Sequence, residues 1–185
     1  MEASDMQAEI RRRYGAVRAL APDATSLVVL HIGAQETTLA VGVGPDPAAT
    51  LVLAIGSQKT AREFFKHTPP SPLEIENAIH AVEDEVTRAK TLIPPDTRLI
   101  TTDVTTRKIA IHSGVIEATL MRLSIETLER SFNRLASVSL GRPAAHEGLP
   151  TSAAFAATLL ILREFMHHLQ FSDITIVAGP AARAI

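Results

Sequence analysis

The sequence predicts an α/β fold in which an antiparallel β-meander is followed by helix–strand units. Three strand-like segments follow one another with tight turns across residues 27–55. Helical apolar stripes then alternate with short strand-like segments up to residue 177. The 185 residues are 46% hydrophobic and 21% charged, which suits one soluble domain with a buried core. We divide them into an N-terminal helix, residues 1–22, and a single α/β domain, residues 23–185.

The first element is a helix over residues 6–20. Its apolar residues recur at spacings of three and four, namely Met6, Ile10, Tyr14, Val17 and Leu20. Pro22 ends it. The three arginines at positions 11–13 are expected to form a solvated face of this helix.

The meander consists of three predicted strands, residues 27–32, 37–43 and 50–55. The first is a nearly continuous apolar run, as in a strand buried on both faces. The second is rich in β-branched residues. Turn-forming residues occupy 33–36 and 44–47 between the strands.

The helix–strand units begin at Ser71, which is placed to cap a helix, with Pro72 at the first helical position and Glu74 completing a capping box. This helix should end before Pro94. Short strands are predicted at 98–102 and 119–123, and Ser124 is placed to cap the next helix.

The last unit follows a loop over residues 141–150. A helix from about residue 151 is apolar on almost every face, which predicts a position in the centre of the domain. A final strand covers 174–177 and is closed by Gly179 and Pro180. This order of elements is compatible with a ribonuclease-H-like core, the unit duplicated in actin-like ATPases, but the pattern alone does not choose it over other α/β folds.

Composition excludes several classes of function. The net charge is −2 without a long basic run, so neither nucleic acid nor an anionic membrane is an expected partner. The absence of cysteine excludes disulfides, thiolate nucleophiles and cysteine-based zinc sites. The N-terminus has no apolar signal core, so we expect a cytoplasmic protein. No phosphate-binding P-loop, nucleophile elbow or zinc-binding helix motif occurs, so no catalytic residue and no metal ligand is predicted.

Three segments carry a resemblance to a known family. Residues 30–42 are similar to the Asp-Ile-Gly-Gly-Gly-Ser-Thr-Glu-Leu signature of the exopolyphosphatase/guanosine-pentaphosphate phosphatase (Ppx/GppA) family. Ile32, Gly33, Thr37 and Leu39 match, whereas the positions that differ are His31, Ala34, Gln35, Glu36 and Thr38. Residues 101–106 resemble the family's Gly-Gly-Thr-Ala-Thr-Thr, with Thr105 and Thr106 kept. Residues 149–185 resemble its closing Leu-Pro loop, alanine-rich helix, strand and final motif.

The resemblance implies the second domain of an actin-like ATPase fold with degraded phosphate-binding loops. It also implies that the family's first domain, which supplies the acid that orients the attacking water, is missing. The phosphate-loop positions carried over are Gly33, Gln35, Glu36, Thr37, Thr105 and Thr106, with His31 and Asp103 as candidate ligand contacts.

The altered loops change the expected chemistry. A glycine-rich turn binds phosphate through exposed backbone N–H groups, and side chains at Ala34 and Gln35 intrude on that space. Carboxylates at Glu36 and Asp103 would repel phosphate unless Mg²⁺ bridged them. Alternatively, Glu36 is an exposed turn residue and Asp103 a helix cap.

Three functions remain open on the sequence. The favoured hypothesis is a non-catalytic binding or assembly module without a cofactor, paired with a second copy or another protein. The second is a phosphoanhydride hydrolase completed by another chain, with Thr37, Thr105 and Thr106 contacting phosphate and Glu36 or Asp103 holding Mg²⁺. The third is a sensor in which His31 and Gln35 contact a nucleotide or another small ligand.

Overall fold

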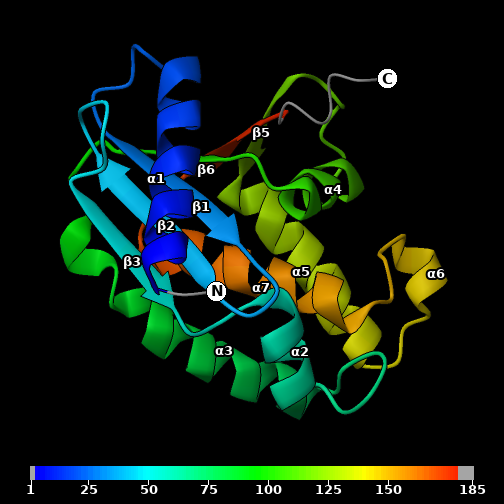
Figure 1. The fold of residues 1–185 in the computed structure, drawn as a ribbon. Helices are drawn as coiled ribbons and strands as arrows, with labels where there is room; N and C mark the ends of the chain where they lie inside the picture. The colour runs from blue at the N-terminus through cyan, green and yellow to red at the C-terminus, as the bar shows by residue number, and fades with distance from the viewer. Residues whose placement is uncertain (1–2, 179–185) are drawn as a thin grey trace.

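The structure is a computed structural model that describes residues 3–178. The segment 179–185, which contains the predicted closing Gly179 and Pro180, lies outside the described residues. Six strands form one sheet in the order β3-β2-β1-β4-β6-β5 (Figure 1). The strands are β1 (Leu27–Ile32), β2 (Thr37–Gly42), β3 (Ala49–Leu53), β4 (Arg98–Thr101), β5 (Leu120–Ser124) and β6 (Asp173–Val177).

The helices account for most of the remaining described chain. They are α1 (Ala3–Leu20), α2 (Ser57–Phe64), α3 (Pro72–Thr87), α4 (Val104–His112), α5 (Ile125–Ser139), α6 (Ala144–Glu147) and α7 (Ala153–His168), with a 3₁₀ turn, η1, at Lys90–Leu92. Between residues 3 and 178 no helix is long and apolar enough to cross a lipid bilayer.

The sheet confirms the predicted α/β arrangement. Strands β1, β2 and β3 pair as an antiparallel meander. Strands β1, β4 and β6 are parallel, and β5 pairs antiparallel with β6. The parallel strands therefore all end at one side of the sheet, which we call the carboxyl edge, and begin at the opposite side, the amino edge.

Helices cover the two faces of the sheet unequally. Helix α7 lies at the centre of the larger core, as its sequence predicts, and α2, α3, α4 and α5 all contact it. Helix α1 lies across the other face and buries Ile10, Tyr14 and Val17 in a second, smaller core (Figure 1). The smaller core reaches only as far as Val177 of β6. The outer part of this face, toward β5, is therefore not covered by α1.

Local signals located some helices and missed others. The capping box of Ser71 and Glu74 is present at the start of α3, and Ser124 caps α5. Helix α2 was not predicted, and α4 begins within the segment interpreted as a loop. Helix α2 has Gly56 at its N-cap and no side-chain cap, so it lacks a local signal of a helix start. Helix α4 has Asp103 at its N-cap, as the alternative interpretation of Asp103 expected, although the Asp103 carboxylate does not make the capping hydrogen bond. The short helix α6 likewise lies within the predicted loop 141–150.

Candidate functional site

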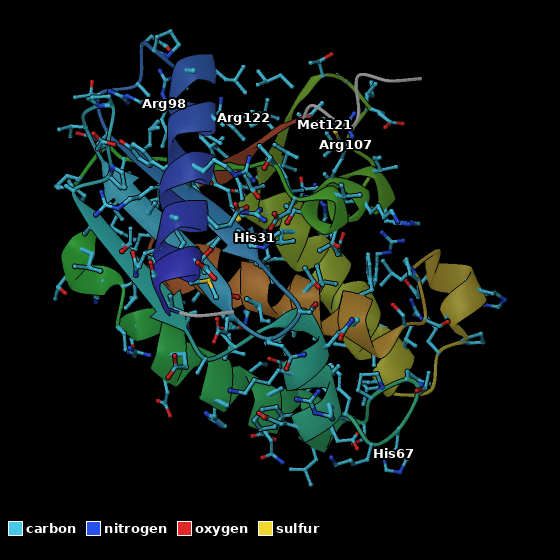
Figure 2. The ribbon with its side chains drawn as sticks, viewed as in Figure 1. His31, His67, Arg98, Arg107, Met121 and Arg122 are labelled. Carbon is cyan, nitrogen blue, oxygen red and sulfur yellow. The ribbon has the colours of Figure 1, made fainter. Side chains whose placement is uncertain are left out.

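Asp103 and His31 meet at the carboxyl edge, where β1 and β4 end side by side. The Asp103 carboxylate lies 2.6 Å from Nδ1 of His31 and accepts a 2.7 Å hydrogen bond from the backbone N–H of Ile32. Asp103 is only 8% exposed, whereas the His31 side chain is 30% exposed beside α1 (Figure 2). Both carboxylate oxygens are therefore engaged by groups of the same chain.

Arg13 of α1 adds a positive charge to this pair. Its Nη1 lies 4.0 Å from Asp103 Oδ1, and its Nε bonds to Glu9 at 2.8 Å. The expectation that all three arginines form a solvated face is therefore wrong for Arg13, whose side chain is 30% exposed. The reason is that α1 packs across the sheet through Ile10, Tyr14 and Val17, and in this position Arg13 lies within 4.0 Å of Asp103.

Backbone groups of the turn between β1 and β2 are hydrogen-bonded within the turn and to the start of α2. The N–H of Gly33 donates to the carbonyl of Glu36 at 2.9 Å. The carbonyl of Gly33 accepts from the N–H of Ser57, and that of Ala34 from the N–H of Gln58, both at 2.9 Å. Residues 57 and 58 begin α2, so the turn satisfies N–H groups that would otherwise be unpaired at the start of this helix.

Gly56 allows the turn to approach α2 this closely. A Cβ at Gly56 would lie 2.5 Å from the carbonyl carbon of Gln35 and 2.7 Å from the carbonyl oxygen of Ala34. Such distances leave no space for a side chain, because both atoms belong to the backbone. The turn and the start of α2 therefore pack as one rigid unit.

The predicted phosphate-loop threonines lie in two different environments. Thr37 and Thr106 are almost fully buried, and in the described part of the chain their hydroxyl oxygens have no hydrogen-bond partner. Thr105 is exposed on α4. The hydroxyls of Thr37 and Thr106 are therefore closed off from any ligand in this conformation, while that of Thr105 faces solvent.

Gln35 and Glu36 point away from the buried pair. Both are exposed on the turn, and the side-chain oxygen of Gln35 accepts a 3.3 Å hydrogen bond from Arg62. Asp103 occupies the N-cap position of α4, but its carboxylate makes no capping hydrogen bond and bonds to β1 instead. Among the side chains predicted from the sequence, the structure thus brings His31 and Asp103 into direct contact, beside Gly33.

The residues at this edge do not fit a Mg²⁺ ion. Magnesium requires carboxylate oxygens that face an open, water-filled coordination site. Both Asp103 oxygens are already engaged, and Glu36 is exposed on the turn. Across residues 3–178 no group of three or more His, Asp or Glu side chains is arranged to hold a metal ion.

The sequence contains a signal for the pairing of His31 with Asp103. His31 lies near the end of one predicted strand, and Asp103 comes directly after another. Parallel neighbours place such positions at the same edge of a sheet. The sequence does not show the strand order or the presence of Arg13 at this edge.

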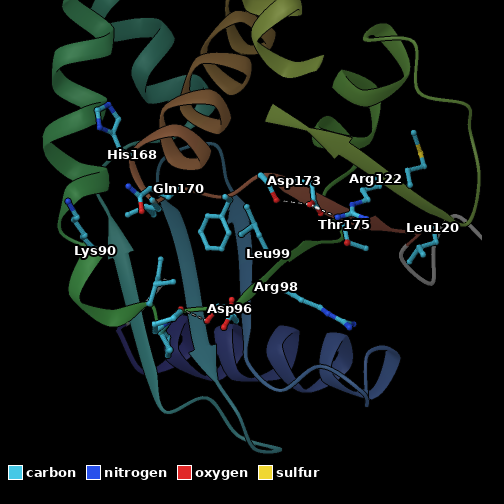
Figure 3. Close-up of a pocket in the computed structure, with 18 residues that line it drawn as sticks. Lys90, Asp96, Arg98, Leu99, Leu120, Arg122, His168, Gln170, Asp173 and Thr175 are labelled. Carbon is cyan, nitrogen blue, oxygen red and sulfur yellow. Dashed lines mark hydrogen bonds and ion pairs between the residues drawn. The ribbon is translucent and has the colours of Figure 1, made fainter. Parts of the chain in front are cut away.

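A cavity lies at the opposite edge of the sheet. It has a volume of about 900 Å³ and is formed by the loop after α3, the turn between α7 and β6, and one face of β5. Lys90, Arg98, Arg122 and His168 surround it (Figure 3). Two carboxylates, Asp96 and Asp173, also line it, and Asp173 is paired with Arg122 at 2.6 Å. None of the positions predicted from the phosphatase resemblance lines this cavity.

Comparison of the structure with solved proteins identifies the fold. A Ppx/GppA phosphatase from Aquifex aeolicus superposes with a TM-score of 0.75 at 16% identity, over 93% of this chain and 59% of that one. An exopolyphosphatase from Cytophaga hutchinsonii gives 0.69 at 17% identity, over 93% of this chain and 59% of its own. An exopolyphosphatase-like protein gives 0.64 at 16% identity, over 97% of this chain and 62% of its own.

These likenesses establish a Ppx/GppA-like fold, consistent with one half of an actin-like ATPase. At 16–17% identity they establish the fold alone. The chain spans about 60% of the length of the structures it matches, 59% and 62% in these cases. No family model and no curated protein sequence matches it.

Proposed function

We propose that this chain is a non-catalytic domain with a Ppx/GppA-like fold, which acts as a binding or assembly module. The observation that carries the proposal is the Asp103 carboxylate at the carboxyl edge. It accepts one hydrogen bond from the backbone N–H of Ile32 and pairs with His31, with Arg13 nearby. The chain's own anion occupies the donors that a phosphate would need.

Backbone geometry at the turn supports this interpretation. A phosphate-binding turn works by leaving successive N–H groups free to converge on oxygen atoms. Here the N–H of Gly33 donates to Glu36 and the N–H of Ile32 donates to Asp103. Two N–H donors at this turn are therefore already satisfied.

Charge supports it as well. Two like unit charges 4 Å apart repel by about 4 kcal/mol at an effective dielectric constant near 20. A phosphate oxygen brought next to Asp103 would meet this repulsion, offset only in part by Arg13 and by His31 when it is protonated. The Glu9 carboxylate lies 2.8 Å from Nε of Arg13 and so partly neutralises the positive charge that Arg13 could offer a phosphate.

The two other hypotheses have less support. The hydrolase requires Mg²⁺ on Glu36 or Asp103, and the surroundings of these residues do not fit that ion. The sensor requires His31 and Gln35 to face a ligand, whereas Nδ1 of His31 is held by Asp103 and Gln35 is bonded to Arg62.

Two assays on the purified chain test the proposal. The first measures phosphate release from polyphosphate and guanosine pentaphosphate with Mg²⁺ or Mn²⁺, and we expect none above the protein-free rate. The second measures the thermal midpoint with polyphosphate, guanosine pentaphosphate, ATP or orthophosphate, with and without Mg²⁺. A ligand that binds only the folded state raises the midpoint in proportion to the logarithm of its concentration over its Kd. We expect no shift for the wild type.

A pair of variants tests the role of Asp103 in this absence of binding. Asp103→Ala frees the N–H of Ile32 and the His31 side chain, so we expect a polyphosphate-dependent rise relative to the variant's own midpoint. Asp173→Ala, the same change at the amino edge, should show no rise. Phosphate release by the wild type, or a dose-dependent midpoint rise with polyphosphate, would overturn the proposal.

A further inference from the structure

The cavity at the amino edge is lined by residues of both charges and by apolar residues. Its volume of about 900 Å³ lies in the range of sites that bind small molecules. Ile93, Leu99 and Phe171 are among its apolar lining residues. Its charged residues differ in whether they have a partner within the chain, and this difference indicates the kind of ligand that fits (Figure 3).

The two arginines that line the cavity are already paired. Arg122 lies 2.6 Å from the carboxylate of Asp173, and Arg98 lies 3.0 Å from that of Asp23. Because each guanidinium has a carboxylate of the same chain beside it, the arginines do not by themselves favour an anionic ligand.

Lys90 and Asp96 line the same cavity without such a partner. Among residues 3–178 neither side chain forms a hydrogen bond or an ion pair, and both are exposed. Figure 3 shows them at separate places around the cavity, so they do not neutralise each other. The cavity therefore offers a ligand one positive and one negative group that lie apart.

The backbone provides an independent observation about this cavity. Of the residues between 3 and 178 other than glycine, only Asp96 and Gln170 have a positive φ, of 55° and 60°, and both line it. Gln170 ends α7 in a Schellman motif, in which its N–H donates to His167 and the N–H of Phe171 donates to Met166. Glycine is usual at this position, because a side chain in the left-handed region costs stability. A strained residue whose side chain borders a cavity indicates a role there.

The Gln170 side chain adds neutral hydrogen-bonding groups beside the two charges. It is exposed and forms no hydrogen bond with the rest of the described chain, residues 3–178. Its amide offers two N–H donors and a carbonyl acceptor, which suit the carboxylate or a peptide group of a ligand.

We propose that this cavity binds a small apolar zwitterion, whose carboxylate pairs with Lys90 and whose ammonium group pairs with Asp96. The apolar body of the ligand lies against Phe171. Free apolar amino acids and short apolar peptides with free termini share this chemistry. The inference rests on the binding role proposed above and gives that role a site and a ligand class. Polyphosphate does not fit, because it has no positive group and would meet the carboxylate of Asp96.

Isothermal titration calorimetry of the purified chain with leucyl-leucine tests the proposal. We expect saturable binding of one peptide per chain. N-acetyl-leucyl-leucine lacks the ammonium group and leucyl-leucinamide lacks the carboxylate, so each should bind about fivefold more weakly, as expected for the loss of one exposed ion pair. Free leucine distinguishes the two sources of ligand: a lower Kd for leucine assigns the site to amino acids, and a lower Kd for leucyl-leucine assigns it to peptides.

Two variants test which residue contacts which end of the ligand. Lys90→Gln should no longer distinguish leucyl-leucine from its amide, and Asp96→Asn should no longer distinguish it from the acetylated form. Lys108→Gln is the matched control, because Lys108 is exposed on α4 and does not line the cavity. Its Kd and its preference for the free peptide should equal those of the wild type.

Gln170→Gly separates binding from folding. Glycine relieves the left-handed backbone, so the thermal midpoint without ligand should equal or exceed that of the wild type. The Kd for leucyl-leucine should nevertheless rise about threefold or more, because the amide contact is lost. An unchanged Kd would contradict the place of Gln170 in the site.

Two results with the wild type would overturn the site as a whole. One is the absence of saturable binding at millimolar leucyl-leucine, and the other is equal Kd values for the free peptide and both blocked forms. A Lys90→Gln variant that behaves like Lys108→Gln would overturn the assignment of the carboxylate. Phosphate release by the wild type would overturn the non-catalytic function and leave this site standing.

Discussion

The carboxyl and amino edges of the same sheet are built in opposite ways. At the carboxyl edge the Asp103 carboxylate, the backbone of residues 32–36 and the start of α2 satisfy one another. At the amino edge a cavity of about 900 Å³ remains between the loop after α3 and the turn before β6. In open α/β sheets ligands normally bind beyond the carboxyl ends of the strands. In this chain the groups at the carboxyl edge are instead hydrogen-bonded to one another.

The largest effect should come from the tight contact at the carboxyl edge. Gly56→Ala places a Cβ 2.5 Å from the backbone of Gln35, so we expect it to lower the free energy of unfolding by about 3 kcal/mol. Urea denaturation measures this. Gly15→Ala is the control, because a Cβ at Gly15 meets nothing within 4 Å and alanine favours the helix. Equal stability of the two variants would show that the turn is not packed against α2.

The next effect compares one substitution at both edges. Asp103→Ala leaves the buried N–H of Ile32 without its acceptor, so we expect a loss of about 2 kcal/mol. Asp173→Ala removes an ion pair with the largely exposed Arg122, for which we expect at most about 1 kcal/mol. Both values come from urea denaturation at neutral pH. Equal losses of unfolding free energy in the two variants would show that the carboxyl and amino edges do not differ in this way.

Much of the fold could be predicted from the sequence, because strands and capped helices are local features. The meander, the capping box at Ser71 and the central position of α7 all follow from residue spacing. Helix α2 could not be predicted, because the carbonyls that satisfy its first N–H groups belong to Gly33 and Ala34, more than twenty residues earlier. Long-range partners of this kind leave no local pattern.

The candidate site was predictable only in part, for the same reason. His31 and Asp103 were singled out as positions within altered loops, and their direct pairing depends on the strand order. Arg13 was missed because helical spacing does not tell which flank of α1 faces the end of β4. The position of β5 at the end of the sheet likewise becomes visible only once β6 is placed between β4 and β5.

Low pH should destabilise the capping box at the start of α3, with a smaller effect than the substitutions above. Helix α3 lies on the connection from β3 to β4, and the pKa of Glu74 in its capping box is lowered to about 2, first by the N–H of Ser71 and then by His67. Since the pKa is lower in the folded state, this stabilisation is present above pH 4.5 and is lost as the pH falls toward 2.

The midpoint of thermal unfolding, followed from pH 5 to pH 2, measures this effect. We expect Glu74→Gln to have a lower midpoint at pH 5 and a shallower decline than the wild type. Glu76→Gln is the control, because Glu76 is exposed on the same helix and outside the capping box. Parallel pH profiles for all three proteins would contradict the assignment.

The smallest effect should occur at the exposed turn. Glu36→Gln changes a carboxylate that points into solvent, so the free energy of unfolding should stay within about 0.5 kcal/mol of the wild type. Urea denaturation gives this value directly. A larger change in either direction would mean that Glu36 takes part in the network at the carboxyl edge.

The place of β6 in the sheet has a consequence for synthesis on the ribosome. This strand comes after β4 and β5 in the chain but lies between them. At about 5–20 residues per second, nascent chains expose incomplete structure for seconds. Until residues 173–177 emerge, β4 and β5 have no strand to join them, and we expect nascent chains shorter than this to be cleaved rapidly by added protease. Protection of this end of the sheet should appear once β6 is released, because β5 can join the sheet only after its sixth strand has been translated.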